Sequence, residues 1–256
     1  MNRETEEDTD LEALLLPGVP AAAIGKALAK ASGDELGSGK FASPESSSAL
    51  AVNAFGRFLE APNNLPPLPG LEDLDWPATR LDVERQMRFP WRGGRHPWLD
   101  AALETRAALV GIESKRFEPF RDAKTVSLSE AYDRDVWGSG MDPWMEVRDS
   151  LRAGALSFTH LDAVQLVKHA FGLVTEGRRL GKTPVLFYIH AEPKRRAGRA
   201  IAPEAIALHR EEIREFSSLV SGATVRLAAS SYRDWLATWS GEAGDHAALL
   251  IDRFAP

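Results

Sequence analysis

The sequence predicts an α/β fold, in which a mixed sheet made of an antiparallel three-stranded meander and one crossover strand is flanked by helices. Three strand-type segments follow one another at 81–89, 97–104 and 108–117. A helical pattern then opens at Thr159, and an apolar run at 184–190 follows it. Strands joined by short turns pair antiparallel, whereas a helix between two strands is typical of a parallel crossover.

The chain before the sheet is expected to hold helices and a connector. Residues 11–31 have a helical pattern that is interrupted by prolines. Ser43 is the candidate N-cap of the next helix, with Pro44 at its first helical position. The proline-rich stretch 61–77 is typical of an extended connector.

The strands differ in their predicted burial. Residues 81–89 alternate apolar and polar side chains, which indicates a half-buried strand. The segments 97–104 and 108–117 are more apolar and are joined by a tight connection at Thr105 to Ala107.

The second half of the chain continues the alternation of helices and strands. Residues 119–152 are expected to form a long loop with one or two helices. The helix that opens at Thr159 has Asp162 in the capping-box position and is expected to end near Gly177 or Gly181. A helix, a strand and a terminal helix are then expected at 203–220, at 224–229 and from about 231.

Composition bounds the class of protein. A chain of 256 residues with 44% hydrophobic and 27% charged residues is typical of a soluble globular protein. It has no cysteine, which excludes disulfides and thiolate metal sites and fits a cytoplasmic location. Residues 1–12 account for −5 of the formal charge of −6. We therefore expect a disordered acidic leader at 1–12 and a single domain at 13–256.

Within that domain the core is expected at about 40–195, followed by a C-terminal helix–strand–helix extension at 200–256. No apolar run approaches the length of a membrane span, and the acidic N-terminus does not have the pattern of a secretory signal, so no membrane association is expected.

The most informative residues are Asp100, Glu113 and Lys115, which carry charge inside two apolar segments. Charge in such a position is costly unless it is paired or binds a metal. A turn centred on Arg106-Ala107 would place Asp100 directly opposite Glu113, and Lys115 points to the same face as Glu113. Two carboxylates and an amine on one face can hold a hard divalent cation and orient a water molecule. A surface row of alternating charge is the alternative, although the flanking residues are very apolar for an exposed edge.

Other charged residues fall into less specific groups. Glu84 lies in the neighbouring strand, where it could extend the acidic site or support it, or else be solvated or pair with a neighbouring arginine. Two basic clusters could contact phosphates or form solvated loops. They comprise Arg85, Arg88, Arg92 and Arg95, and then Lys194, Arg195, Arg196 and Arg199.

The Asp and Glu-x-Lys pattern resembles the PD-(D/E)XK nuclease superfamily, which has the restriction-endonuclease-like fold. The matching residues are Pro97-Trp-Leu-Asp100 and Glu113-Ser-Lys115, although Trp-Leu separates the proline from the acid. The chain is most similar to uncharacterised bacterial proteins classed as restriction endonucleases, through the segments 40–53, 99–100 and 112–118. The resemblance spans roughly 40–195 and implies a restriction-endonuclease-like core.

The resemblance implies a metal-dependent nuclease that hydrolyses DNA phosphodiester bonds, as a restriction, defence or DNA-processing endonuclease. Asp100 and Glu113 would bind Mg²⁺ or Mn²⁺, and Lys115 would orient or deprotonate water and neutralise the phosphate. Gln165 would touch the metal-bound water or a phosphate and Lys168 a phosphate, unless both lie on an exposed helix face.

Two further readings stay open. The same fold could bind nucleic acid or a protein without cutting, and RNA could replace DNA as the substrate. The expected partner is DNA, and the sequence does not choose between a monomer and a homodimer.

Overall fold

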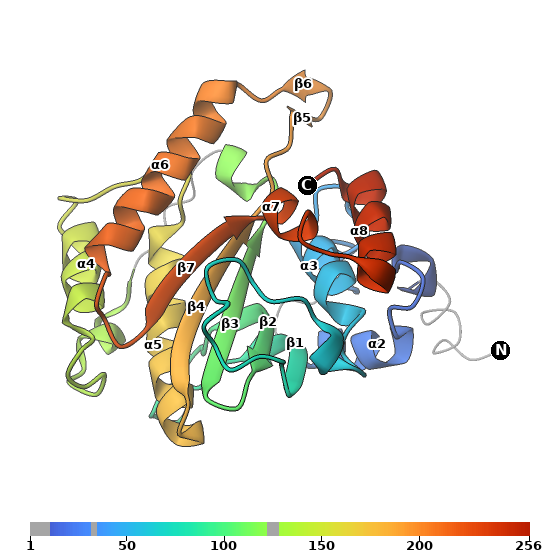
Figure 1. The fold of residues 1–256 in the computed structure, drawn as a ribbon. Coiled ribbons are helices and arrows are strands. Elements are labelled where there is room, and N and C mark those ends of the chain that lie inside the picture. Colours follow the sequence, from blue (N-terminus) through green and yellow to red (C-terminus); the bar gives the residue numbers. More distant parts are fainter. Residues whose placement is uncertain (1–10, 32–34, 122–127) are drawn as a thin grey trace.

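A five-stranded mixed sheet forms the centre of the protein, with the strand order β1-β2-β3-β4-β7 (Figure 1). The computed structural model describes residues 11–31, 35–121 and 128–256. Strands β1, β2 and β3 pair antiparallel, and β4 and β7 continue the sheet in parallel. The predicted meander and crossover strand are therefore confirmed. The strands are β1 (Arg80–Gln86), β2 (Trp98–Glu104), β3 (Ala108–Lys115), β4 (Thr183–His190) and β7 (Arg226–Ser231).

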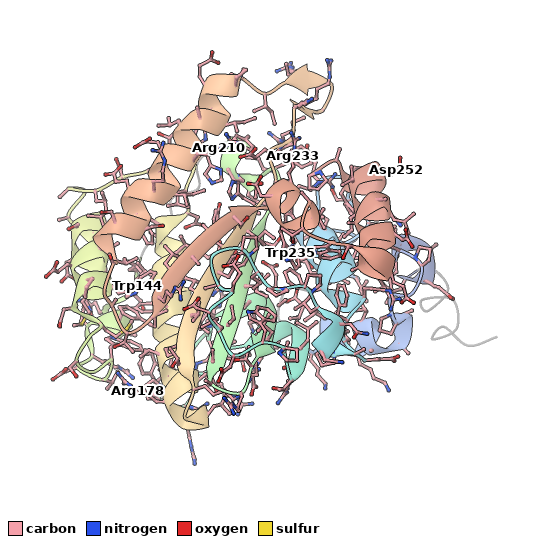
Figure 2. The ribbon with its side chains drawn as sticks, in the orientation of Figure 1. Trp144, Arg178, Arg210, Arg233, Trp235 and Asp252 are labelled. Atoms are coloured by element: carbon pink, nitrogen blue, oxygen red, sulfur yellow. The ribbon has the colours of Figure 1, made fainter. Side chains whose placement is uncertain are left out.

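Helices cover both faces of this sheet. The described helices are α2 (Ala21–Lys30), α3 (Ser47–Gly56), α4 (Asp142–Arg152), α5 (Ala163–Leu180), α6 (Pro203–Leu219), α7 (Tyr232–Leu236) and α8 (Gly241–Phe254). One apolar core lies between the sheet and α2, α3, α7 and α8, and the other between the sheet and α4, α5 and α6. Trp235 and Trp144 are buried in these two cores, on opposite sides of the sheet (Figure 2). Because both faces are covered, β3 is buried along almost its whole length.

The β2–β3 hairpin has the predicted turn. The Thr105 N–H donates to the Ala108 carbonyl over 3.0 Å, which closes a two-residue loop at Arg106-Ala107. The Thr105 hydroxyl also accepts from the Ala108 N–H at 3.0 Å. The resulting register pairs Ala101 with Ile112.

Two predicted helix starts are wrong. The helix expected from Pro44 begins at Ser47, and the Ser46 hydroxyl, not Ser43, accepts the Ala49 N–H. The helix expected from Thr159 begins at Ala163, and Asp162 is its N-cap.

Glu212 gives the physical reason for the later start of α5. Its buried carboxylate accepts the backbone N–H groups of Thr159, His160 and Leu161. These donors are satisfied outside a helix, so the segment stays non-helical until Asp162 caps α5.

The segment between β3 and α5 and the C-terminal elements agree with the prediction, although their bounds differ. The segment after β3 contains short 3₁₀ turns at Glu118–Phe120 and Glu130–Asp133 and then α4, whereas 122–127 lie outside the described residues. The expected terminal helix is divided into α7 and α8. The C-terminal strand β7 pairs with β4, so the C-terminal segment supplies an integral strand of the sheet.

The close approach of α5 to the meander depends on glycine. A Cβ on Gly172 would lie 2.7 Å from Met87 Cβ and 2.9 Å from Pro97 Cγ. Both neighbours belong to the connection between β1 and β2, so a side chain at this position would push the helix away from it.

The acidic leader predicted at 1–12 lies mostly outside the described residues. Residues 1–10 of the predicted acidic leader lie outside the described residues, whereas 11–14 are helical and Leu11 is buried in the core. Among the helices of the described ranges, none combines the length and apolar character needed to cross a membrane.

Candidate active site

Asp100 and Glu113 lie across from each other where the β2–β3 ladder ends. The ladder ends with Ala101 paired to Ile112, and one further step in the same register places Asp100 opposite Glu113. At that point the Ser114 N–H donates to Asp100 Oδ2 over 2.7 Å. A side-chain carboxylate thus replaces a main-chain carbonyl as the acceptor, which fixes Asp100 at this end of the sheet.

Glu113 is held between Lys115 and His169. Its Oε1 contacts Lys115 Nζ, and its Oε2 lies 2.9 Å from Nε2 of His169 on α5. Burial disfavours the charged carboxylate, but the charges of Lys115 and His169 outweigh burial and hold the pKa of Glu113 at about 2. Glu113 is therefore a carboxylate throughout the neutral pH range.

Lys115 is charged for the reciprocal reason. Burial lowers the pKa of its ammonium, but the neighbouring carboxylates of Glu113, Asp100 and Glu118 outweigh that effect and raise the pKa above its ordinary value. The side chain is 12% exposed, so the ammonium is within reach of solvent from one side.

Asp100 experiences the opposite balance. Burial raises its pKa well above the ordinary value, and the charge of Glu113 adds to the effect. Lys115 and the Ser114 N–H only partly compensate. Ionisation of Asp100 beside the charged Glu113 is therefore unfavourable, and a bound cation would make it less so.

Glu84 adds a third carboxylate beside Asp100 and Glu113, and these three residues are called the acidic row. The pairs Val83 with Ala101 and Arg85 with Leu99 bracket it, so it lies across from Asp100. Its backbone has φ +50°, in the left-handed region that β residues rarely adopt. Burial raises the pKa of Glu84 to about 7, and nearby negative charge acts in the same direction.

The contacts of Glu84 decide between the readings of its role. Its Oε1 accepts from the Ser48 hydroxyl of α3 at 3.2 Å, and no arginine pairs with it among the residues that the structure describes. The predicted alternative of a salt bridge to a neighbouring arginine is therefore not observed, and Glu84 belongs to the acidic row.

Helix α5 contributes to the site through residues one turn apart. Gln165 lines a cavity together with Lys115, and His169, four positions later, contacts Glu113. Lys168 is half-buried and does not line that cavity, and burial lowers its pKa. The structure thus brings Gln165 to Lys115 but leaves Lys168 outside the cavity.

Sequence reasoning missed His169. The signal was present, because Gln165 and His169 are four residues apart and share a helix face. The interpretation paired Gln165 with Lys168 instead, since both are polar and three residues apart.

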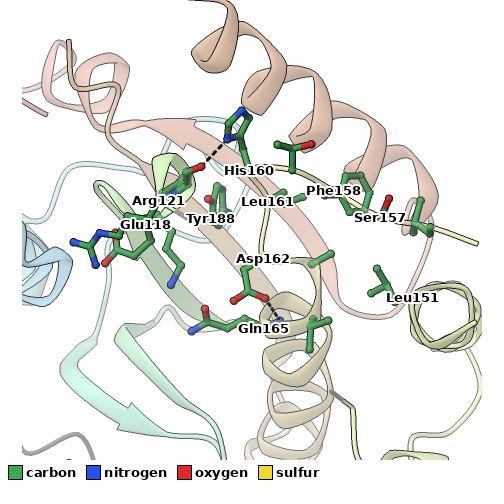
Figure 3. Close-up of a pocket in the computed structure, with 16 residues that line it drawn as sticks. Glu118, Arg121, Leu151, Ser157, Phe158, His160, Leu161, Asp162, Gln165 and Tyr188 are labelled. Atoms are coloured by element: carbon green, nitrogen blue, oxygen red, sulfur yellow. Dashed lines mark hydrogen bonds between the residues drawn. The ribbon is translucent and has the colours of Figure 1, made fainter. Parts of the chain in front are cut away.

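The cavity beside Lys115 has a volume of about 630 Å³ (Figure 3). Its polar end is formed by Lys115, Glu118 and Gln165, and its apolar wall includes Leu156 and Phe158. The first turn of α5, capped by Asp162, borders it (Figure 3). Lys115 therefore forms the boundary between an open cavity and the acidic row behind it.

The metal-binding capacity of the site rests on its carboxylates. Across the three described ranges, no group of three or more His, Asp or Glu side chains is arranged to hold a metal ion. Mg²⁺ is commonly held by one or two carboxylates together with water and substrate phosphate. Asp100 and Glu113 fit that smaller donor set, because each supplies carboxylate oxygens at the same end of the sheet.

Comparison of the chain with protein-family models, curated proteins and solved structures finds no match in any of the three.

Proposed function

We propose that this protein is a metal-dependent nuclease that hydrolyses DNA phosphodiester bonds. The observation that supports the proposal is the convergence of Asp100, Glu113 and Lys115 at one end of the sheet. The order of antiparallel meander, crossover helix α5 and parallel strand β4 is also that of the restriction-endonuclease-like core which the sequence resembles. A restriction, defence or DNA-processing endonuclease is the corresponding class.

Each side chain has a defined role in this proposal. Asp100 and Glu113 would hold Mg²⁺ or Mn²⁺, with Glu84 supporting them from the next strand. A bound divalent cation would lower the pKa of a water molecule and stabilise charge on the phosphodiester. Gln165, at the mouth of the cavity, is placed to orient a phosphate or water by hydrogen bonding.

Lys115 acts by charge in this scheme. Because its pKa is raised, it is an ammonium at neutral pH and has no free electron pair with which to accept a proton. Of the two roles expected from the sequence, electrostatic stabilisation of the phosphate is therefore favoured over general base catalysis.

A catalytically silent binding module of the same fold is the second candidate. Both oxygens of Glu113 already contact nitrogen atoms of other side chains, one of Lys115 and one of His169. In such a module these contacts would be structural, and a metal would not replace them.

Cleavage of plasmid and linear DNA with Mg²⁺, Mn²⁺ or a chelator tests the first candidate. Asp100→Asn is the sharpest variant, because the amide oxygen can still accept the Ser114 N–H while the charge is removed. We expect a loss of cleavage of about 100-fold or more, since metal stabilisation of the transition state amounts to several kcal/mol. Asp75→Asn, at a partly exposed carboxylate that pairs with Arg106, is the matched control.

Calorimetric titration with Mn²⁺ separates the two candidates. Binding heat that Asp100→Asn abolishes supports the nuclease. The nuclease proposal is wrong if no heat is observed and the wild type does not cleave DNA, or if no heat is observed and Asp100→Asn cleaves at the wild-type rate. Either result favours the binding module.

A further inference from the structure

A short β-hairpin follows the central strand β4. Its strands are β5 (Arg195–Arg196) and β6 (Arg199–Ala200), which pair antiparallel. The Ile201 N–H donates to the Lys194 carbonyl over 3.0 Å and extends the ladder. In Figure 1 the hairpin stands clear of the sheet and of the helices on either side.

The tip of this hairpin is narrow and conformationally fixed. Its two loop residues, Ala197 and Gly198, have φ of +46° and +79°. Positive φ at both central residues is the signature of a type I′ turn, which matches the right-handed twist of a two-stranded ribbon. Arg195 also donates to the Gly198 carbonyl over 2.5 Å, across the turn. The tip therefore carries little side-chain bulk.

The hairpin is strongly basic. The segment 193–203 contains four basic residues and no acidic ones. Lys194, Arg195 and Arg199 are exposed. Because the rest of the chain has more acidic than basic residues, this is a local concentration of positive charge.

One arginine of the cluster anchors the hairpin to the body. Arg196 Nε lies 3.0 Å from Glu45 Oε1, and Arg121 pairs with the other oxygen of Glu45 at 2.9 Å. Glu45 lies just before α3. Arg196 is therefore held by a contact with the body of the protein, whereas Lys194 and Arg199 are exposed on the hairpin.

The arm leaves from the end of the sheet that carries the candidate site. His190, the last residue of β4, is the register partner of Lys115 on β3. The hairpin begins five residues after His190, so its path starts beside the ammonium of Lys115.

We propose that the β5–β6 hairpin is an arm that grips duplex DNA, with its two-stranded ribbon in the major groove and Lys194 and Arg199 on the flanking phosphates. The major groove of B-form DNA admits a two-stranded β-ribbon, whereas that of A-form RNA is too narrow and deep. The inference rests on the proposed function for the identity of the substrate and specifies that the substrate is double-stranded.

Binding in the presence of chelator tests the arm without cleavage. Fluorescence anisotropy with a labelled 20-base-pair DNA duplex is measured over a series of salt concentrations for the full chain and for Lys194→Gln/Arg199→Gln. Each lost phosphate contact lowers the salt dependence of log K by about 1. We expect the double variant to bind about 10- to 100-fold more weakly near 0.1 M salt, with a salt slope reduced by about 2.

A matched control has the same chemical change in the other basic cluster. Arg92 and Arg95 are exposed in the turn between β1 and β2. That turn packs beside the C-terminal half of α5, where Glu176 accepts the Arg88 N–H. Arg92→Gln/Arg95→Gln is expected to change duplex binding less than twofold, with an unchanged salt slope.

The outcomes distinguish the arm from the nuclease. Arm-dependent duplex binding without metal-dependent cleavage supports the arm and overturns the proposed function. If the protein cleaves DNA but the salt dependence of duplex binding is the same in Lys194→Gln/Arg199→Gln as in the wild type, the proposed role of the hairpin is wrong and the nuclease proposal stands. Equal affinity for duplex RNA or for single-stranded DNA, or no binding of DNA by the full chain, also overturns the arm.

Discussion

The acidic row should cost the protein stability at neutral pH, and Glu84 allows this cost to be measured. Burial raises the pKa of Glu84 from 4.5 to about 7. A change of this size corresponds to ~3 kcal/mol of free energy at neutral pH. We therefore expect Glu84→Gln to raise the free energy of unfolding by up to about 3 kcal/mol at pH 8, since the amide can still accept the Ser48 hydroxyl.

The sign of the pH dependence follows from the direction of the shift. Between pH 4.5 and about 7 the folded protein retains a proton on Glu84 that the unfolded chain has lost. The contribution of Glu84 to stability is therefore most favourable below pH 4.5 and falls as the pH rises to about 7. Above pH 7 the contribution is constant.

Urea unfolding followed by far-UV circular dichroism at pH 4.5, 6, 7 and 8, with chelator present, measures this effect. The difference between Glu84→Gln and the wild type should grow from pH 4.5 to 7 and then stay level. Glu60→Gln is the control, because Glu60 is exposed. A Glu84→Gln protein whose stability follows the wild-type curve at every pH would refute the reasoning.

Two further changes test the packing around the site. Glu113→Gln removes the carboxylate between Lys115 and His169. We expect urea unfolding at pH 7 to show about 3–5 kcal/mol of destabilisation, because the buried ammonium of Lys115 loses its partner. An unchanged unfolding midpoint would contradict this account of the pair. Gly172→Ala places a methyl group 2.7 Å from Met87 Cβ and should lower the free energy of unfolding by about 1–3 kcal/mol in the same measurement. The comparison variant is Gly39→Ala, whose added methyl group meets no neighbour. Gly39 has a positive φ, so that change should cost only backbone strain.

Local patterns in the sequence were sufficient for the central elements. Alternating and apolar segments predicted β1, β2, β3 and β4. The β2–β3 register was a hypothesis, because it required a turn centred on Arg106-Ala107 and no Asn-Gly or Asp-Gly pair marks one there. The structure has that turn, and its register places Asp100 across from Glu113.

Helix starts were less predictable, because several residues could serve as caps. Ser43 and Ser46 are equally good N-cap residues by type. In the structure the Ser43 hydroxyl accepts the Glu45 N–H within the preceding turn, and Ser46 caps α3. The start of α5 depends on Glu212, which is about fifty residues further along the chain and takes the donors that a longer helix would use. Such a contact has no local signature.

The sequence by itself determined the five segments that form the central sheet and placed Glu113 and Lys115 on one face of their strand, because alternation and apolar character along a strand are local properties. The β5–β6 hairpin and the turn that aligns β2 with β3 became definite only in the structure. Only the tertiary structure decided that His169 contacts Glu113, that Glu84 joins the acidic row and that Arg196 ties the basic hairpin to Glu45. These contacts depend on the rotation of α5 over the sheet and on the meeting of segments up to about 150 residues apart. Burial then sets the charges of the site, because desolvation acts on a side chain only after the whole core has closed around it.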